Sequence, residues 1–173
     1  VFTEIPNKIF VTHEYARNGR LIDYLDHCYD MHKHPDEDVI WKVAAIVANA
    51  LTSSNLKKRN DTSEFVHGHL CPAAIFITHE GQLKLGHLEY FRLIGKTSCT
   101  LPIENTSLYA APEAVLRKEF TSKSDAWSLG CILYELCRLD PAINLSVDDD
   151  AAKYFATDPK VTIDTARYSD ELA

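Results

Sequence analysis

Residues 65–89 constrain the fold of this chain more than any other stretch. They contain three short apolar runs, at residues 65–66, 75–77 and 83–85, and a polar cluster follows the first run and the last. Short apolar runs bounded by turn residues are typical of strands, and the polar residues 79–81 between the last two runs indicate a tight hairpin. The sequence therefore predicts a loop and then a hairpin, with polar side chains at the ends of the strands.

Longer segments on both sides of this stretch show the periodicity of helices. Residues 39–51 place apolar side chains on one helix face, behind a run of acids that suits a helix start. Residues 121–139 begin with capping residues and become apolar around most of the helix from Trp127 onward, which predicts a buried central helix. A shorter helix is predicted over residues 20–30 and a hairpin over residues 2–15.

Composition excludes several classes of protein. The chain has 173 residues, 46% of them hydrophobic, which is enough apolar material for one globular domain. A formal net charge of −7 and the lack of a basic stripe argue against a nucleic-acid or anionic-membrane partner. No apolar run is long enough to span a bilayer. Five cysteines without CxxC spacing indicate free thiols rather than a disulfide framework or a zinc finger, so we expect a cytoplasmic protein.

The two polar clusters resemble the catalytic core of protein kinases of the NIMA-related (Nek) family. In that family the first cluster is His-Arg-Asp-Leu-Lys-Pro-Ala-Asn, and the second is Lys-Leu-Gly-Asp-Phe-Gly. The chain matches the first cluster at His67, Leu70, Pro72 and Ala73, and it matches the start of the second at residues 84–86. The chain therefore keeps matching residues in both motifs.

Further matches extend the resemblance over almost the whole chain. Residues 111–113 match the family's Ala/Ser-Pro-Glu motif, and Asp125, Trp127 and Gly130 match the pattern Asp-x-Trp-Ser-x-Gly. The resemblance implies an α+β, protein-kinase-like fold, with a mainly helical large lobe and a remnant hairpin of the small lobe.

The resemblance also implies how the chain is divided. Residues 1–16 correspond to a remnant small-lobe hairpin and the hinge, and residues 17–173 correspond to the large lobe, incomplete at its C-terminal end. Because a complete kinase domain extends further, the chain is expected to be truncated at both ends. Asp125 is expected to cap backbone amides of the catalytic loop, and Glu113 is expected to be unpaired because its arginine partner would lie beyond Ala173.

The positions that carry the family's chemistry hold other residues. By resemblance, the replaced positions are Gly68 (arginine in the family), His69 (the base aspartate), Cys71 (lysine), Ala74 (asparagine), His87 (the metal-binding aspartate) and Glu89 (glycine). Phosphoryl transfer depends on positioning and electrostatics, and loss of a general base alone costs roughly 10²- to 10⁴-fold in rate. No catalytic residue is therefore expected, and the chain is interpreted as a pseudokinase rather than an enzyme.

The first hypothesis for function is a Nek-like pseudokinase that acts as a protein-binding scaffold or regulator without phosphotransfer. Its partners would be other proteins, including cytoskeletal proteins or an active kinase, and neither nucleic acid nor membrane. The family resemblance implies a cytoplasmic location with cytoskeletal association. The alternative is an atypical serine/threonine protein kinase, or a nucleotide-binding switch, whose small lobe is missing from this chain.

A nucleotide site is also implied by the resemblance. Glu14 and Ala16 would offer backbone groups to an adenine, and Phe76 joins them as a candidate nucleotide contact. Magnesium prefers hard oxygen ligands, and a methyl group at Ala74 with an imidazole at His87 offers none. No cofactor is therefore expected, and the alternative keeps ATP bound without magnesium.

A separate hypothesis is a zinc site formed by His69, Cys71 and His87. In the kinase fold these three positions converge on one cleft, and two imidazoles with a thiolate suit zinc. The spacing HxHxC matches no known structural zinc signature. The competing interpretation is that both histidines are neutral fillers of an idle pocket.

Overall fold

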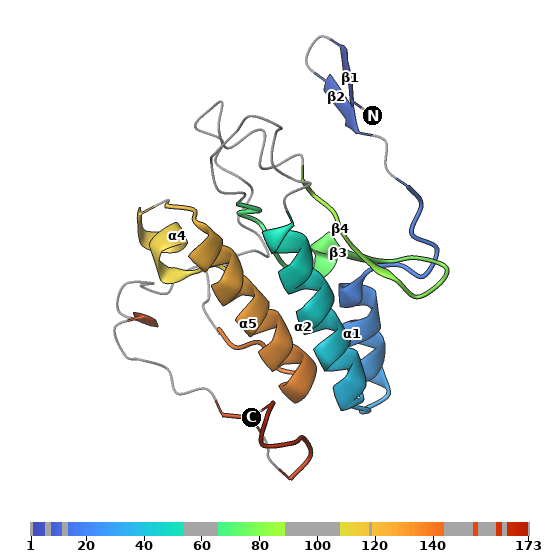
Figure 1. Cartoon of the computed structure of the whole chain (residues 1–173), viewed down its shortest axis with the longest axis vertical. Helices are drawn as coiled ribbons and strands as arrows, with labels where there is room; N and C mark the ends of the chain where they lie inside the picture. Colours follow the sequence, from blue (N-terminus) through green and yellow to red (C-terminus); the bar gives the residue numbers. More distant parts are fainter. Residues whose placement is uncertain are drawn as a thin grey trace.

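The computed structural model describes most of the chain. The described residues are 2–5, 8–11, 14–53, 66–88, 108–117, 119–143, 154–155, 162–163 and 166–172. Within these ranges no helix combines the length and the apolar character needed to cross a membrane. Figure 1 shows a helical body with two short hairpins, which confirms the α+β fold class.

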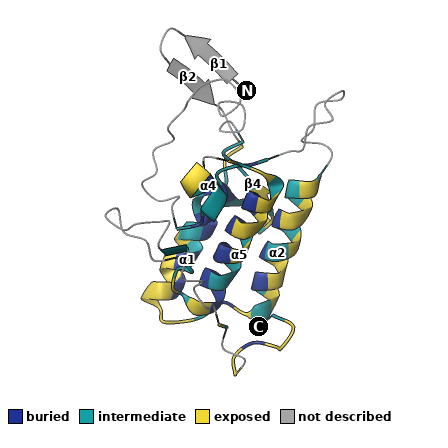
Figure 2. Cartoon of the chain, turned by 90° about the vertical axis from the view of Figure 1, so that its left-hand side faces the viewer, coloured by how far each residue is buried: buried dark blue, intermediate teal, exposed yellow. Residues whose placement is uncertain are grey.

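Three helices form most of the body: α1 (Leu21–Asp30), α2 (Glu37–Thr52) and α5 (Ser122–Arg138). Helices α2 and α5 pack against each other. The core buries the following side chains from these helices: Leu21, Leu25, Cys28, Ile40, Val43, Val47, Cys131, Ile132 and Leu136. On α1 and α2 they recur at helical spacing, and Figure 2 shows such buried faces opposite exposed ones. The predicted periodicity of these helices is confirmed.

The helix ends differ from the prediction in two places. Arg20 is the N-cap of α1 and not part of it, because the Asp23 carboxylate accepts a hydrogen bond from the Arg20 backbone N–H at 2.8 Å. Helix α5 ends at Arg138, since Leu139 adopts a left-handed φ of 52°. Trp127, where the buried stretch of α5 was predicted to begin, is 39% exposed and lies edge-on to the ring of Phe155.

Both predicted hairpins are present as antiparallel pairs. Strand β3 (Ile75–Ile77) pairs with β4 (Leu83–Leu85), with Phe76 opposite Lys84. Strand β1 (Phe2–Ile5) pairs with β2 (Lys8–Val11) at the N-terminal end of the chain. The short 3-10 helix η2 (Pro72–Ala74) leads into β3.

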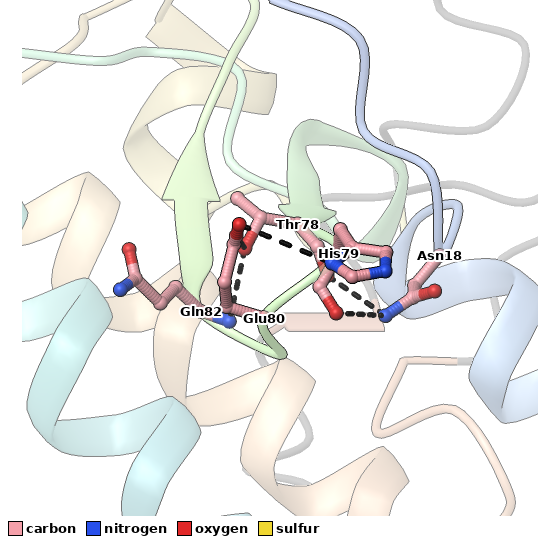
Figure 3. Close-up of polar contacts among 5 residues, drawn as sticks. All are labelled: Asn18, Thr78, His79, Glu80 and Gln82. Atoms are coloured by element: carbon pink, nitrogen blue, oxygen red, sulfur yellow. Dashed lines mark hydrogen bonds and ion pairs between the residues drawn. The ribbon is translucent and has the colours of Figure 1, made fainter.

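The β3–β4 hairpin is attached to the chain segment before α1. The Asn18 side-chain amide donates to the carbonyl of Thr78, with a distance of 2.8 Å (Figure 3). The backbone of Arg20 bridges to Phe76, and the Lys84 ammonium pairs with the Glu14 carboxylate. Residues 14–20 are therefore fixed along one side of the hairpin.

Helix α4 (Pro112–Arg117) has proline at its first position, where the missing N–H costs nothing. The Glu113 carboxylate accepts a hydrogen bond from the Ser124 hydroxyl at 2.6 Å. The expectation that Glu113 is unpaired is therefore wrong, because Ser124, in the first turn of α5, supplies a hydrogen-bond donor.

Candidate active site

The loop of residues 66–71 is held by a buried carboxylate from the first turn of α5. Asp125, which is 2% exposed, accepts hydrogen bonds from the backbone N–H groups of His67 at 2.6 Å and Gly68 at 2.8 Å. Charge-assisted bonds of this kind are stronger than neutral ones. The predicted capping role of Asp125 is confirmed.

Gly68 adopts a φ of 71°, in the left-handed region. A residue with a Cβ pays about 1–2 kcal/mol there, and glycine pays almost none. The glycine that replaces the family's arginine therefore suits the backbone of this loop.

His67 connects the loop to the end of β4. Its ring is fully buried, and its Nε2 lies 2.8 Å from the carbonyl oxygen of Gly86. Its Nδ1 accepts a hydrogen bond from the backbone N–H of His69 at 3.3 Å. A carbonyl only accepts and an amide only donates, so His67 is neutral and carries its proton on Nε2.

His69 and His87 face the same space, although they lie on different segments. Their ring centroids are 6.1 Å apart, and the His87 ring is edge-on to Phe76 with centroids 5.8 Å apart. His87 has a φ of 57°, which is uncommon for a residue with a side chain and occurs at functional or strained positions. The structure therefore brings together three of the predicted site positions.

His69, Cys71 and His87 do not form the zinc site that was hypothesised for them. Cys71 is buried, and burial raises the pKa of its thiol, which disfavours the thiolate that zinc requires. Within the described ranges, no group of three or more His, Cys, Asp or Glu side chains is arranged to hold a metal ion. Ala74, where the family has asparagine, is fully buried. Its carbonyl accepts a hydrogen bond from the Gly86 N–H at 2.8 Å, and this bond joins η2 to the residue after β4.

The remaining predicted positions lie along the hairpin or outside the described residues. The Glu14 carboxylate pairs with Lys84, and the Ala16 carbonyl accepts from the Gly19 N–H at 3.2 Å in a turn. Glu89 lies outside the described residues. Glu14 and Ala16 therefore stand beside the hairpin that carries Phe76.

A buried polar pair near the loop was not predicted from the sequence. The Tyr109 hydroxyl donates to Glu135 Oε2 at 2.6 Å, and both residues are 6% exposed. Burial raises the pKa of Glu135, and the hydrogen bond from Tyr109 opposes that rise in part. The available signal was a glutamate within the mostly apolar part of a helix, where a buried acid requires a partner.

A loop capped by Asp125 and followed by an antiparallel hairpin agrees with the protein-kinase-like fold that the sequence predicts. The chain matches the protein kinase domain family over residues 1–169, and it belongs to that family. It is 31% identical over 166 residues to serine/threonine-protein kinase Nek2 of Homo sapiens, covering 95% of this chain and 37% of that protein. It is 25% identical over 157 residues to G2-specific protein kinase nimA of Emericella nidulans, covering 79% of this chain and 22% of that protein. The chain is thus related to protein kinases of the Nek family, and it spans 37% of the first of these relatives and 22% of the second.

These relatives correct one expectation. The replaced loop positions were interpreted as the mark of a protein that is not an enzyme. The related proteins from Homo sapiens, Emericella nidulans and Dictyostelium discoideum are all named protein kinases, which points to an enzyme. The interpretation was wrong because it considered only the six replaced residues and not the similarity of the whole chain to proteins that are named kinases.

Proposed function

We propose that this chain is part of a serine/threonine protein kinase of atypical mechanism, with an imidazole where the family uses a carboxylate base. One observation carries the proposal: Asp125 holds the His67 and Gly68 amides, so the loop that presents His69 is fixed in place. Positioning supplies much of the catalysis of phosphoryl transfer, and this frame provides it.

His69 is the residue proposed to take the proton from the attacking hydroxyl. Histidine is the side chain most often used as a general base, because its ordinary pKa lies near neutral pH. The His69 side chain is half-buried, and the backbone N–H of His69 donates a hydrogen bond to the His67 ring. A hydroxyl-bearing protein segment that reached this ring would transfer its proton to an imidazole nitrogen.

Magnesium does not fit the described part of the site. The two positions that would supply oxygen ligands hold a methyl group, at Ala74, and an imidazole, at His87. We therefore propose that ATP binds without magnesium at these positions, beside the hairpin and the segment of residues 14–20 that is hydrogen-bonded to it. The backbone groups of Glu14 and Ala16 and the ring of Phe76 are the proposed contacts of the adenine.

The division of the chain is part of the same proposal. Residues 1–16 would be the remnant of the small lobe and the hinge, and residues 17–173 the large lobe. The expected protein partners, cytoskeletal proteins or an active kinase, stay predictions, as does the cytoskeletal location.

The first test is a thermal melt of the chain with ATP, with and without magnesium. A ligand at 100 times its Kd stabilises the folded state by roughly 2.7 kcal/mol, which raises the Tm by several degrees in a chain of this size. We expect this shift with ATP alone, and no further shift on adding magnesium. A shift that requires magnesium would contradict the proposed mode of binding.

The second test is transfer of labelled phosphate from ATP to a generic protein substrate. His69→Ala should lower the transfer rate roughly 10²-fold or more and leave the ATP-induced melting shift unchanged. The matched control is His27→Ala, which removes an exposed imidazole from α1. If the unaltered chain neither transfers phosphate nor gains stability from ATP, the proposed function is wrong.

A further inference from the structure

The segment of residues 108–111 leads into α4, which lies beside α5 (Figure 1). The Tyr109 hydroxyl donates to Glu135 Oε2 at 2.6 Å, near the C-terminal end of α5. The Ser124 hydroxyl, in the first turn of α5, donates to Glu113 at 2.6 Å. Ser124 and Glu135 lie roughly 16 Å apart along the helix axis, so the segment and α4 are fixed on α5 at two separate points. The proposed function uses neither contact.

The contact between Tyr109 and Glu135, the latch, is buried. Each residue is 6% exposed, and Tyr109 packs in the same hydrophobic core as Ile132 and Leu136. A buried carboxylate is costly when it is ionised, unless donors or cations satisfy it. In the part of the chain that the structure describes, Glu135 takes part in no salt bridge. The Tyr109 hydroxyl is thus the donor that stabilises its ionised form.

The charged groups that act on Glu135 are acids. They are Asp26 on α1 and Asp140, just after α5, and both disfavour a further anion. Arg138, on the same helix as Glu135, is exposed, so water screens its charge. An ionised Glu135 would therefore add a third negative charge to this region.

The other titratable groups near Glu135 stay neutral. Burial raises the pKa of the Tyr109 hydroxyl, so this hydroxyl remains a hydrogen-bond donor. Burial also raises the pKa of Tyr29, on α1, to about 12 and that of Cys131, one turn earlier on α5, to about 12. None of these groups supplies a positive charge that would compensate an ionised Glu135.

We propose that the latch is a pH-sensitive device, which holds residues 108–111 on α5 while Glu135 is protonated and opens when Glu135 loses its proton. A protonated carboxyl group still accepts the hydrogen bond from Tyr109 and carries no charge, so it can stay buried. The ionised carboxylate is hydrated in the open state, where water replaces the apolar surroundings. Opening also exposes Tyr109 and Ala111, which is 1% exposed in the closed state. The latch does not depend on phosphotransfer.

The direction of the pH dependence follows from the two states. In the closed state burial raises the pKa of Glu135 from its ordinary value of 4.5, the hydrogen bond from Tyr109 opposes the rise, and Asp26 and Asp140 add to it. In the open state the hydrated Glu135 has its ordinary pKa, so the closed state binds the proton more tightly. The open population should therefore rise by up to about tenfold per pH unit above pH 4.5, and level off above the closed-state pKa.

The test is amide hydrogen exchange of the full chain, measured by mass spectrometry from pH 5 to 8. The Val115 N–H donates to the Ala111 carbonyl at 3.0 Å, so exchange in residues 108–117 reports release of the segment. Each rate is divided by the rate of Glu135→Gln at the same pH, which removes the intrinsic pH dependence of exchange. Glutamine can accept the same hydrogen bond and never ionises. We expect the ratio to rise severalfold between pH 5 and 8.

Tyr109→Phe is a second variant, which keeps the ring in the core and removes the donor. The ionised form of Glu135 loses more than the protonated form, because hydrogen bonds to charged groups are the stronger ones. Exchange in residues 108–117 should therefore exceed that of the unaltered chain more at pH 8 than at pH 5. The matched control Glu119→Gln removes an exposed carboxylate just after α4 and should keep the pH dependence of the unaltered chain.

Three outcomes would overturn the proposal. A ratio that stays constant from pH 5 to 8 would show that Glu135 does not control the segment. An equal rise in the exchange of the α2 amides would show that the whole chain unfolds as pH rises, and not the latch alone. Loss of the pH dependence in Glu119→Gln would assign the effect to surface charge.

Discussion

Asp125 is the residue on which the geometry of the candidate site depends. Its two carboxylate oxygens accept from two consecutive backbone amides, and the carboxylate is almost fully buried. Replacing it with alanine would leave both amides without their acceptor, in a place that water does not reach. The geometry of the loop and the stability of the fold are therefore coupled through this one side chain.

Asp125→Ala should lower the free energy of unfolding by about 3 kcal/mol, because buried hydrogen bonds to a charged acceptor are lost and their donors remain buried. Urea denaturation measures this loss. The control Asp30→Ala removes an exposed carboxylate at the end of α1 and should change the stability by less than about 0.5 kcal/mol. Equal effects of the two substitutions would show that the hydrogen bonds of Asp125 make no net contribution to the free energy of unfolding.

The buried pair of Tyr109 and Glu135 makes stability depend on pH. The pKa of Glu135 is raised by burial from an ordinary value of 4.5, so the folded state holds this proton more tightly than the unfolded state. The stability that Glu135 contributes is therefore full below pH 4.5 and is lost as pH rises toward the folded-state pKa. Each pKa unit of difference corresponds to about 1.4 kcal/mol.

Glu135→Gln should remove this dependence. We expect the free energy of unfolding of the unaltered chain to fall relative to that of Glu135→Gln as pH is raised above 4.5, measured by urea denaturation at a series of pH values. Both chains carry the same other carboxyl groups, so the effects of those groups cancel when the two free energies of unfolding are subtracted. A difference that stays constant between pH 4 and 8 would contradict the raised pKa.

At the scale of elements, Gly86 determines how β4 approaches β3. A Cβ at this position would lie 2.3 Å from Cε2 of the Phe76 ring, far inside contact distance. Gly81, in the turn of the same hairpin, has a φ of 73° and no atom within 4 Å of such a Cβ. The two glycines are thus required for different reasons, close packing in one case and backbone conformation in the other.

Gly86→Ala should destabilise the chain by about 1–3 kcal/mol through overpacking against Phe76. Phe76→Leu in the same chain should recover much of that loss, because the smaller side chain leaves room for the methyl group. Gly81→Ala should cost about 1–2 kcal/mol through its left-handed φ and gain nothing from Phe76→Leu. Equal effects of Phe76→Leu in both backgrounds, measured by thermal unfolding, would exclude the proposed contact.

The elements themselves were largely predictable, and several contacts between them were not. Periodicity located α2, and the turn residues 79–81 located the β3–β4 hairpin, because both signals are local. The pairing of Glu113 with Ser124 and of Tyr109 with Glu135 depends on how separate elements pack, which no local pattern encodes. Cys71 was grouped with His69 and His87 because the kinase resemblance places the three positions in one cleft, but a resemblance does not fix side-chain burial, and the Cys71 thiol is buried and forms no metal group with them.

At the scale of the whole molecule, the C-terminal segment of residues 166–172 is attached to the start of α2. Ser169 donates to Glu37 twice, and the Tyr168 hydroxyl donates to the Pro35 carbonyl. These bonds join positions more than 130 residues apart. Periodicity located α2 but gave no sign of this attachment, because it is formed by irregular chain.

The attachment predicts protection of the peptide bond after Arg167 from trypsin. Glu37→Ala removes the acceptor of both Ser169 bonds, so residues 166–172 should open more often and be cut severalfold faster, since proteolysis of a locally opened segment follows the population of the open state. Limited digestion followed by mass spectrometry measures the rate at this bond. Asp38→Ala, which removes the next acid in the same helix turn, is the matched control and should leave the rate unchanged. If both variants are cut at the rate of the unaltered chain, the Glu37 bonds do not hold the segment, and Tyr168 alone must attach it.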